Sequence, residues 1–149
     1  MTLSLQDAAR PGLLRVLAAI FYDLWLIAAI WMLGVIVDTF VRSALTGSAS
    51  EGSHLLLWAW WAISPFLFYL WFWTHGGQTL GMRAWRIRLV DAAGEPVNAK
   101  AALRRSLFAL LSWAPAGLGF VWILFDAQRN SWHDRLSDTY LVLTAKNKA

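Results

Sequence analysis

Charged and histidine side chains gather directly after an apolar run near the C-terminus, in FVWILFDAQRNSWHDRLSDTY (120–140). Their nitrogen and oxygen atoms are of the type that bind metals, and a histidine earlier in the chain could join them. The candidate metal ligands are Asp126, His133, Asp134, Asp138 and His75. No two histidines stand four residues apart, and neighbouring side chains on a helix point about 100° apart. We therefore expect no metal and no other cofactor at these residues.

A structural clamp suits Asp134 better than metal binding. A guanidinium binds a carboxylate through two parallel hydrogen bonds, and Asp134 is followed by the last strand candidate, so it could also cap the turn between them. His133, its neighbour, is expected to point away, toward lipid headgroups or the turn after the second apolar run. The residues offered as structural partners in this cluster are Arg83, Arg104, Arg105, Asp126 and His133.

A second candidate site lies in the first apolar run, where Arg15 and Asp23 stand eight positions apart. On a helix this spacing is about 80° of rotation and about 12 Å of rise, so both side chains lie on one broad face. A charge inside hydrocarbon costs several kcal/mol, and such residues usually have a partner or a function. Asp23 either pairs with Arg15 or with an arginine of the third apolar segment (Arg104 or Arg105), or it exchanges a proton or a cation. These alternatives stay open.

Enzymatic chemistry finds little support in the residues. The stretch GGQTLGMR (76–83) lacks the lysine–hydroxyl ending of a phosphate-binding loop, and its glycines are better explained as a tight exit from the preceding apolar run. There is no cysteine, which excludes disulfides and thiolate metal sites. We expect that the chain is not an enzyme.

The composition is that of a membrane protein. Of the 149 residues, 58% are hydrophobic and only 15% are charged, against about 45–50% and about 25% in soluble domains. The mean hydropathy is +0.48. A basic chain with eleven tryptophans is also a pattern of nucleic-acid binding, but here the tryptophans lie inside apolar runs, where they favour the membrane interface. The expected partner is the lipid bilayer.

Two apolar runs are long enough to cross a membrane, which takes roughly 20 residues. They are residues 16–37 and 54–74, and the second contains Pro65. Residues 38–53 between them, rich in small residues, are predicted to form a loop. A third apolar segment, 103–126, is interrupted near Pro115 by APAGLG. It predicts either a helical hairpin that enters the bilayer and returns, which we favour, or a single kinked span.

Two short stretches outside the apolar runs favour strands. In AWRIRLV (84–90) apolar and basic residues alternate, and TYLVLT (139–144) is rich in β-branched and aromatic residues. AAGEPV forms a turn after the first, and Asn98 is a candidate N-cap for a helix. We predict an all-α membrane protein with a small two-stranded β-ribbon, organised as one domain over residues 10–146.

The basic residues predict the orientation, because short loops rich in lysine and arginine stay cytoplasmic. The loop after the first span has only Arg42, so it is expected outside. The N-terminal tail and the connector after the second span, with the ribbon, are expected to be cytoplasmic. Their basic residues are Arg10 and Arg15 in the tail, and Arg83, Arg86, Arg88, Lys100, Arg104 and Arg105 in the connector.

Taken in order, several of these stretches resemble the RDD family of small bacterial membrane proteins. They are Arg15 and Asp23, then GQTLGMRAWRIRLVDAAGEPV, then the arginine of ALRRS, then WILFDAQRNSWHDRLSDTYLV. The resemblance implies that Arg15, Asp23 and Asp134 are the arginine and two aspartates that give the family its name. It also implies a multi-pass protein of a bacterial inner membrane. The chain departs from the family at Asn130-Ser131-Trp132, where relatives often have a glutamine.

Two functions are consistent with these residues and with the resemblance, since transport has been suggested for the family. In the first, the protein is a transporter or transport-associated protein that exchanges cations against protons. Asp23 is then the exchanging carboxylate, and the small number of helices implies a homo-oligomer. In the second, the protein is a scaffold or accessory subunit that does not transport. Its basic connector then binds a partner or anionic lipid.

Overall fold

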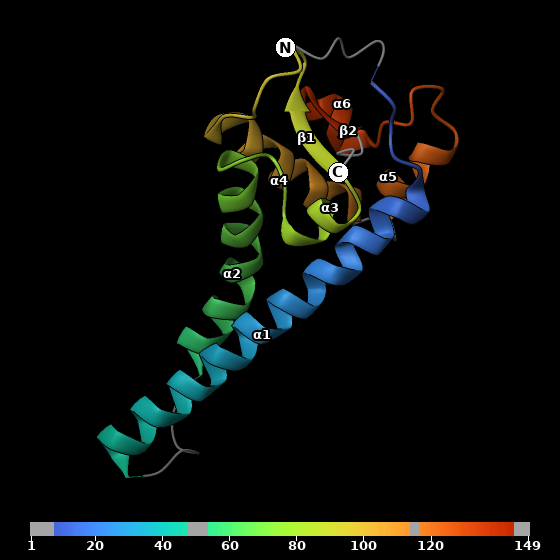
Figure 1. Cartoon of the computed structure of the whole chain (residues 1–149). Coiled ribbons are helices and arrows are strands. Elements are labelled where there is room, and N and C mark those ends of the chain that lie inside the picture. The colour runs from blue at the N-terminus through green and yellow to red at the C-terminus, as the bar shows by residue number, and fades with distance from the viewer. Residues whose placement is uncertain (1–7, 48–53, 114–116, 145–149) are drawn as a thin grey trace. The chain divides into compact units, whose positions relative to one another are not determined.

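A computed structural model of the chain describes residues 8–47, 54–113 and 117–144. Helices predominate, and one small sheet accompanies them (Figure 1). The elements in chain order are α1 (Leu13–Thr46), α2 (Leu55–Thr74), α3 (Leu80–Ala84), β1 (Ile87–Asp91), α4 (Ala99–Trp113), α5 (Leu118–Val121), the 3-10 helix η1 (Trp122–Leu124), α6 (Trp132–Ser137) and β2 (Thr139–Leu143).

The described residues divide into two compact units. The first unit combines Met1–Asp23 with Tyr69–Ala149, and the second is Leu24–Phe68. The first unit therefore contains the start of α1, the end of α2 and all the shorter elements. Both sites suggested by the sequence belong to it.

Two helices are long and apolar enough to cross a membrane, Leu13–Leu45 within α1 and Leu55–Thr74, which is α2. Both predicted spans are therefore helical. The loop predicted for residues 38–53 is wrong over 38–46, because α1 continues to Thr46. Asp38 and Arg42 form an ion pair one turn apart at 2.9 Å, and the helix ends before Gly47, whose φ of 71° favours glycine. Residues 48–53 lie outside the described part.

The second unit joins the two long helices through tryptophans. The indole Nε1 of Trp31 donates to the hydroxyl of Ser64 at 3.1 Å. Trp60 donates to the carbonyl of Ile30 at 3.2 Å, and its ring lies directly against Gly34. These two indole N–H groups thus find acceptors, whereas the buried Nε1 of Trp61 has no hydrogen-bond partner among the described residues.

The predicted ribbon is confirmed as a two-stranded antiparallel sheet. β1 and β2 pair in a register that sets Ile87 opposite Leu143. The turn after β1 is held by the carboxylate of Asp91, which accepts from the amides of Ala93 and Glu95, each at 2.9 Å. The N-terminal tail adds one more bond, from the amide of Leu143 to the carbonyl of Ala9 at 2.8 Å.

This pairing bears on the two predictions for the third apolar segment. Two hydrogen-bonded strands lie on the same side of any bilayer, so the chain between them must return to the side on which it starts. The pairing therefore favours the helical hairpin over 103–126, and the hairpin stays a prediction. The segment contains the end of α4, then α5 and η1; its predicted break near Pro115 lies outside the described residues. The predicted N-cap is confirmed, since the side chain of Asn98 accepts from the amide of Ala101 at 2.9 Å.

The first unit packs around a small apolar core at the start of α1. The core draws on α1, α2, α3, β1 and α4, and its buried members are Val16, Ala19, Trp73, Met82, Ile87, Leu89, Val97 and Ala102. Among these elements only α3 was not predicted from the sequence. It is the part of the core that brings the GQTLGM stretch against α1.

Candidate functional site

The buried polar network around Asp134 begins with the short helix α6. Its N-cap is Ser131, whose hydroxyl accepts from the amide of Asp134 at 3.3 Å. The Asp134 carboxylate returns to the cap and accepts from the Ser131 amide at 2.6 Å and from its hydroxyl at 2.5 Å. This reciprocal capping box satisfies helix amides that would otherwise lack a partner. Asp134 is 2% exposed.

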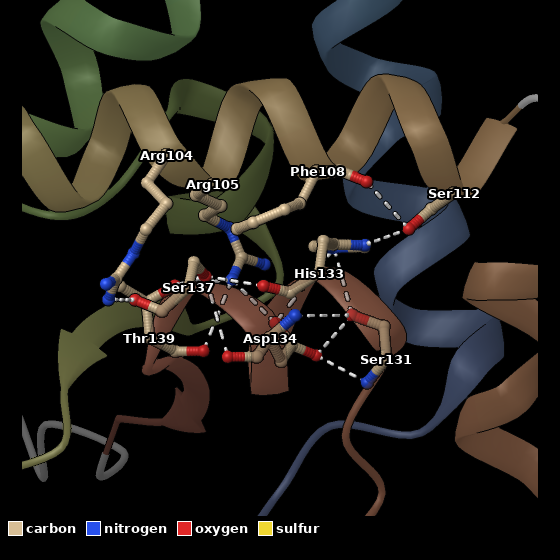
Figure 2. A network of polar contacts seen from close by, with 9 residues as sticks. All are labelled: Arg104, Arg105, Phe108, Ser112, Ser131, His133, Asp134, Ser137 and Thr139. Carbon is tan, nitrogen blue, oxygen red and sulfur yellow. Dashed lines mark hydrogen bonds and ion pairs between the residues drawn. The ribbon is translucent and has the colours of Figure 1, made fainter.

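The second oxygen of Asp134 forms an ion pair with α4. Nη1 of Arg105 lies 2.6 Å from Oδ1 of Asp134, and Arg105 is only 3% exposed. Figure 2 shows Arg105 pointing from α4 toward α6, where Asp134 lies. The contact is electrostatic rather than a well-directed hydrogen bond, because Oδ1 receives no hydrogen bond of regular geometry from the described residues.

Arg105 also ties the last strand and the core to this pair. Its Nη1 donates to the hydroxyl of Thr139 at 2.8 Å and to the Thr139 carbonyl at 3.3 Å. Its guanidinium lies over the ring of Trp73, 5.3 Å from the ring centroid. One arginine therefore contacts α6, the start of β2 and the end of α2.

The charge of Asp134 is retained despite its burial. Burial alone would raise the pKa of its carboxyl. The positive charge of Arg105, followed by the neighbouring His133 and the Ser131 hydrogen bonds, outweighs this effect and lowers the pKa below its usual range. The network thus contains a buried carboxylate anion paired with a buried guanidinium cation.

His133 is buried within the same network, which corrects the expectation that it points away. Its Nδ1 lies 3.2 Å from the hydroxyl of Ser112 on α4, and its Nε2 lies 3.0 Å from the hydroxyl of Ser131 (Figure 2). The ring packs on Phe120 of α5 at 4.6 Å between centroids. A neutral imidazole donates from one nitrogen and accepts at the other, so one serine hydroxyl turns its hydrogen toward the ring. Burial, then the Arg105 charge, lower the pKa of His133 to about 3.

Two outer ion pairs flank the buried network. Arg104 reaches Asp138 at 3.0 Å and also donates to the carbonyl of Ser137. Arg135 pairs with Asp126, whose other oxygen accepts from the amide of Asn130 at 2.8 Å. Arg83 is exposed and forms no ion pair with any described residue. Of the three arginines offered as partners of Asp134, the structure thus brings Arg105 to it.

Asp23 belongs to a separate polar contact between α1 and α3. Its Oδ2 accepts from the hydroxyl of Thr79 at 2.6 Å, and its Oδ1 accepts from the amide of Gly81 at 2.9 Å. Thr79 is also the N-cap of α3, since its hydroxyl accepts from the amide of Met82 at 3.1 Å. Asp23 is 1% exposed, so both of its oxygens are enclosed and occupied.

Gly81 allows this contact to be so close. A Cβ placed there would collide with the carbonyl oxygen of Ala19 and stand 2.8 Å from Oδ1 of Asp23. No side chain larger than hydrogen fits between α3 and α1 without a shift of the backbone. Gly81 of the GQTLGM stretch therefore serves helix packing rather than phosphate binding.

Arg15 does not pair with Asp23 in this structure, in contrast to one alternative raised by the sequence. Arg15 is half-buried and forms no ion pair with a described residue. Arg104 and Arg105 turn instead toward α6 and β2. Asp23 accordingly has hydrogen-bond donors but no described cation against it.

Several residues of these two sites were missed by the sequence analysis. Ser131 could have been found, because Ser-x-x-Asp before a helix is the pattern of a capping box. Thr79, Ser112 and Thr139 carry no local signal, since their partners lie 56, 21 and 34 residues away along the chain. Within the described residues, no group of three histidine, aspartate or glutamate side chains is placed to hold a metal.

The chain has two candidate membrane spans. Its buried charged residues contact other residues of the same chain. These features define a helical membrane protein whose buried charges connect its own helices and strands. The family is given by the match of the RDD family model to residues 10–138. The chain belongs to the RDD family, and RDD proteins are membrane proteins. No curated protein and no solved structure matches the chain.

Proposed function

We propose that this protein is a membrane-embedded scaffold whose signature aspartates lock its elements together. One observation carries the proposal: both aspartates are enclosed, and their oxygens contact partners within the same chain. Asp23 binds Thr79 and Gly81, and Asp134 binds Arg105 and Ser131. A carboxylate that serves an ion pathway would need an opening to water or to the transported ion. The proposal includes no catalytic step.

The scaffold holds the basic connector on the cytoplasmic face of a bacterial inner membrane. The tail, the connector and the ribbon belong to one compact unit, so all of them share one side of the bilayer. The basic residues of that unit outnumber Arg42, the one lysine or arginine of the second unit, which favours the cytoplasmic side. The N-terminus is then cytoplasmic, and the chain crosses the membrane more than once.

Anionic phospholipid headgroups are the proposed partner of this connector. Arg83, Arg86 and Lys100 are exposed, and Arg83 has no acidic partner among the described residues. Each basic residue near an anionic surface contributes about 1 kcal/mol of attraction. Arg83 lies on α3, Arg86 lies between α3 and β1, and Lys100 lies on α4, so the folded backbone already holds all three in place.

Cation/proton exchange is the second candidate, and one specific observation favours it. Asp23 lies within an apolar span and has no described cation against it, so its carboxyl could bind and release a proton. Such a protein would work as a homo-oligomer, because two long helices enclose no pathway of their own.

Ion flux in proteoliposomes separates the two candidates. Wild-type protein, Asp23→Asn and Asp38→Asn are compared under a proton gradient with a panel of monovalent cations. Asp38→Asn is the matched control, since Asp38 also lies on α1 but pairs with Arg42. The scaffold proposal expects all three to equal empty vesicles. Flux in the wild type and in Asp38→Asn that disappears in a folded Asp23→Asn variant would contradict the scaffold and establish exchange.

A further inference from the structure

We propose that the outward face of α4, together with α5 and η1, lies among the acyl chains of a single membrane leaflet. The outward side chains of α4 recur at three- and four-residue spacing, which places them on one face of a helix. They are Leu103, Leu107, Leu110 and Leu111, and between 43% and 64% of each is exposed.

The opposite side of α4 is polar and buried. Arg105, Ser106 and Ser112 point into the unit, where Arg105 and Ser112 contact α6. A helix at the surface of a water-soluble protein has the reverse arrangement, with its apolar stripe inward. The inversion in α4 indicates that the medium around its outer face is apolar.

α5 and η1 extend this apolar surface. Gly119 of α5 lies directly against Ser112 of α4, so the chain has turned back onto the helix it left. The outward side chains here are Leu118, Trp122, Leu124 and Phe125, between 42% and 76% exposed. Large apolar side chains gathered on adjoining elements form an exposed surface of the kind that contacts a membrane or a partner.

The lengths limit how deep this segment reaches. α4 has 15 residues, or roughly 22 Å at 1.5 Å per residue, which is less than the roughly 30 Å of a hydrocarbon core. From Arg104 to Trp113 the rise is only about 14 Å, close to one leaflet. Since the pairing of β1 with β2 returns the chain to its starting side, the segment enters and leaves through the same surface.

Basic residues at both ends of the segment select lipid over a second copy of the chain. Arg104 and Arg135 are paired with Asp138 and Asp126. Lys100, exposed on α4 one turn before the leucines, and Arg129, exposed after the return, form no ion pair with a described residue. Two like-charged copies facing each other here would repel, whereas phosphate headgroups would attract these side chains.

The proposal concerns how the unit sits in lipid and holds whether the protein is a scaffold or a transporter. Because the chain has no cysteine, single cysteines can carry a nitroxide label in full-length protein reconstituted in vesicles. The test positions are Leu111→Cys and Leu124→Cys. The lipid reference is Leu33→Cys, exposed on the apolar span α1, and the water reference is Ala93→Cys, exposed in the turn after β1.

Relaxation of each label by oxygen, which concentrates in acyl chains, is compared with relaxation by a water-soluble nickel chelate. At both test positions the ratio of the relaxation rate caused by oxygen to that caused by the nickel chelate should equal the ratio measured for Leu33→Cys. It should exceed the ratio for Ala93→Cys about tenfold, because polar solutes are excluded from hydrocarbon. A ratio like that of Ala93→Cys would overturn the proposal. So would dipolar broadening that disappears when labelled protein is diluted with unlabelled protein, which would show a second copy on this face. Each variant must keep the wild-type melting temperature, and Leu110→Cys on the same face replaces any that does not.

Discussion

The buried ion pair between α4 and α6 makes a sharp prediction for Asp134→Asn. Asparagine has nearly the size and shape of aspartate but no charge, so Arg105 keeps its position and loses its counter-ion. Thr139 and Ser131 cannot replace the lost charge, since they offer only neutral oxygens. The variant therefore contains a buried cation with hydrogen bonds but no anion.

The burial of both partners sets the magnitude. Asp134 is 2% exposed and Arg105 is 3% exposed, and breaking a buried pair by removing one partner costs about 3–5 kcal/mol. In a chain of 149 residues each kcal/mol lowers the melting temperature by roughly 2–4 °C. We expect a decrease of roughly 6–20 °C.

The assay is thermal unfolding in mild detergent, followed by circular dichroism and by recovery of monodisperse protein. Asp138→Asn is the matched control, because Asp138 pairs with Arg104 at 3.0 Å but is largely exposed. An exposed pair contributes at most about 1 kcal/mol. The double variant Asp134→Asn/Arg105→Met has no unpaired charge. It should be more stable than the sum of the two single changes implies, since groups in contact are not additive.

An Asp134→Asn variant that melts within 2 °C of the wild type would refute this reasoning. It would mean that water or another anion reaches Arg105 and that the network is more open than its geometry indicates. Additive effects of the two single changes would show independently that Arg105 and Asp134 do not stabilise each other.

Two further predictions concern the neighbouring contacts. Gly81→Ala should lower the melting temperature by the equivalent of several kcal/mol, because the new methyl group meets Asp23 and the backbone of α1. Gly12→Ala, where a Cβ would meet nothing closer than 4.0 Å, should be nearly neutral, and equal melting of the two variants would contradict the close packing. Burial lowers the pKa of His133 from 6.5 to about 3, so the unfolded chain binds a proton that the folded chain does not. Stability should fall by about 2 kcal/mol between pH 7 and pH 5, and His133→Gln should remove that slope; an unchanged slope would show that His133 is not its source.

The sequence predicts those parts of the fold whose signals are local. Long apolar runs indicate α1 and α2, and alternation of apolar and basic residues indicates β1. The extension of α1 through residues 38–46 was missed because small residues suggest a loop, whereas the Asp38–Arg42 pair and the absence of a breaker continue the helix. The five-residue α3 has too few residues for a periodic pattern, and its cap also bonds to Asp23, 56 residues away.

The candidate site shows the same limit at the level of single residues. Arg104 and Arg105 are adjacent and chemically identical, so no local pattern says which of them meets Asp134. Their side chains leave α4 about 100° apart, and the rotation of α4 about its axis decides which one meets Asp134. That rotation depends on packing, with Ala102 buried in the core and Ser112 against His133. For His133 the prediction failed because its serine partners come from two different elements.

The bond between Ala9 and Leu143 and the pairing of β1 with β2 also constrain the order of assembly during synthesis. The ribosome releases the N-terminal part first, so α1 is made while its polar partners are still missing. Asp23 has no hydrogen bond from Thr79 until that residue, 56 positions later, has been made. Arg105 likewise has no counter-ion until α6 has been made. Only when the final strand emerges can the tail, the ribbon and the charged network close together. The last strand therefore completes the folding of the first unit. In a nascent chain that lacks this strand, the polar groups that contact it must bind other partners, such as water, lipid or another protein.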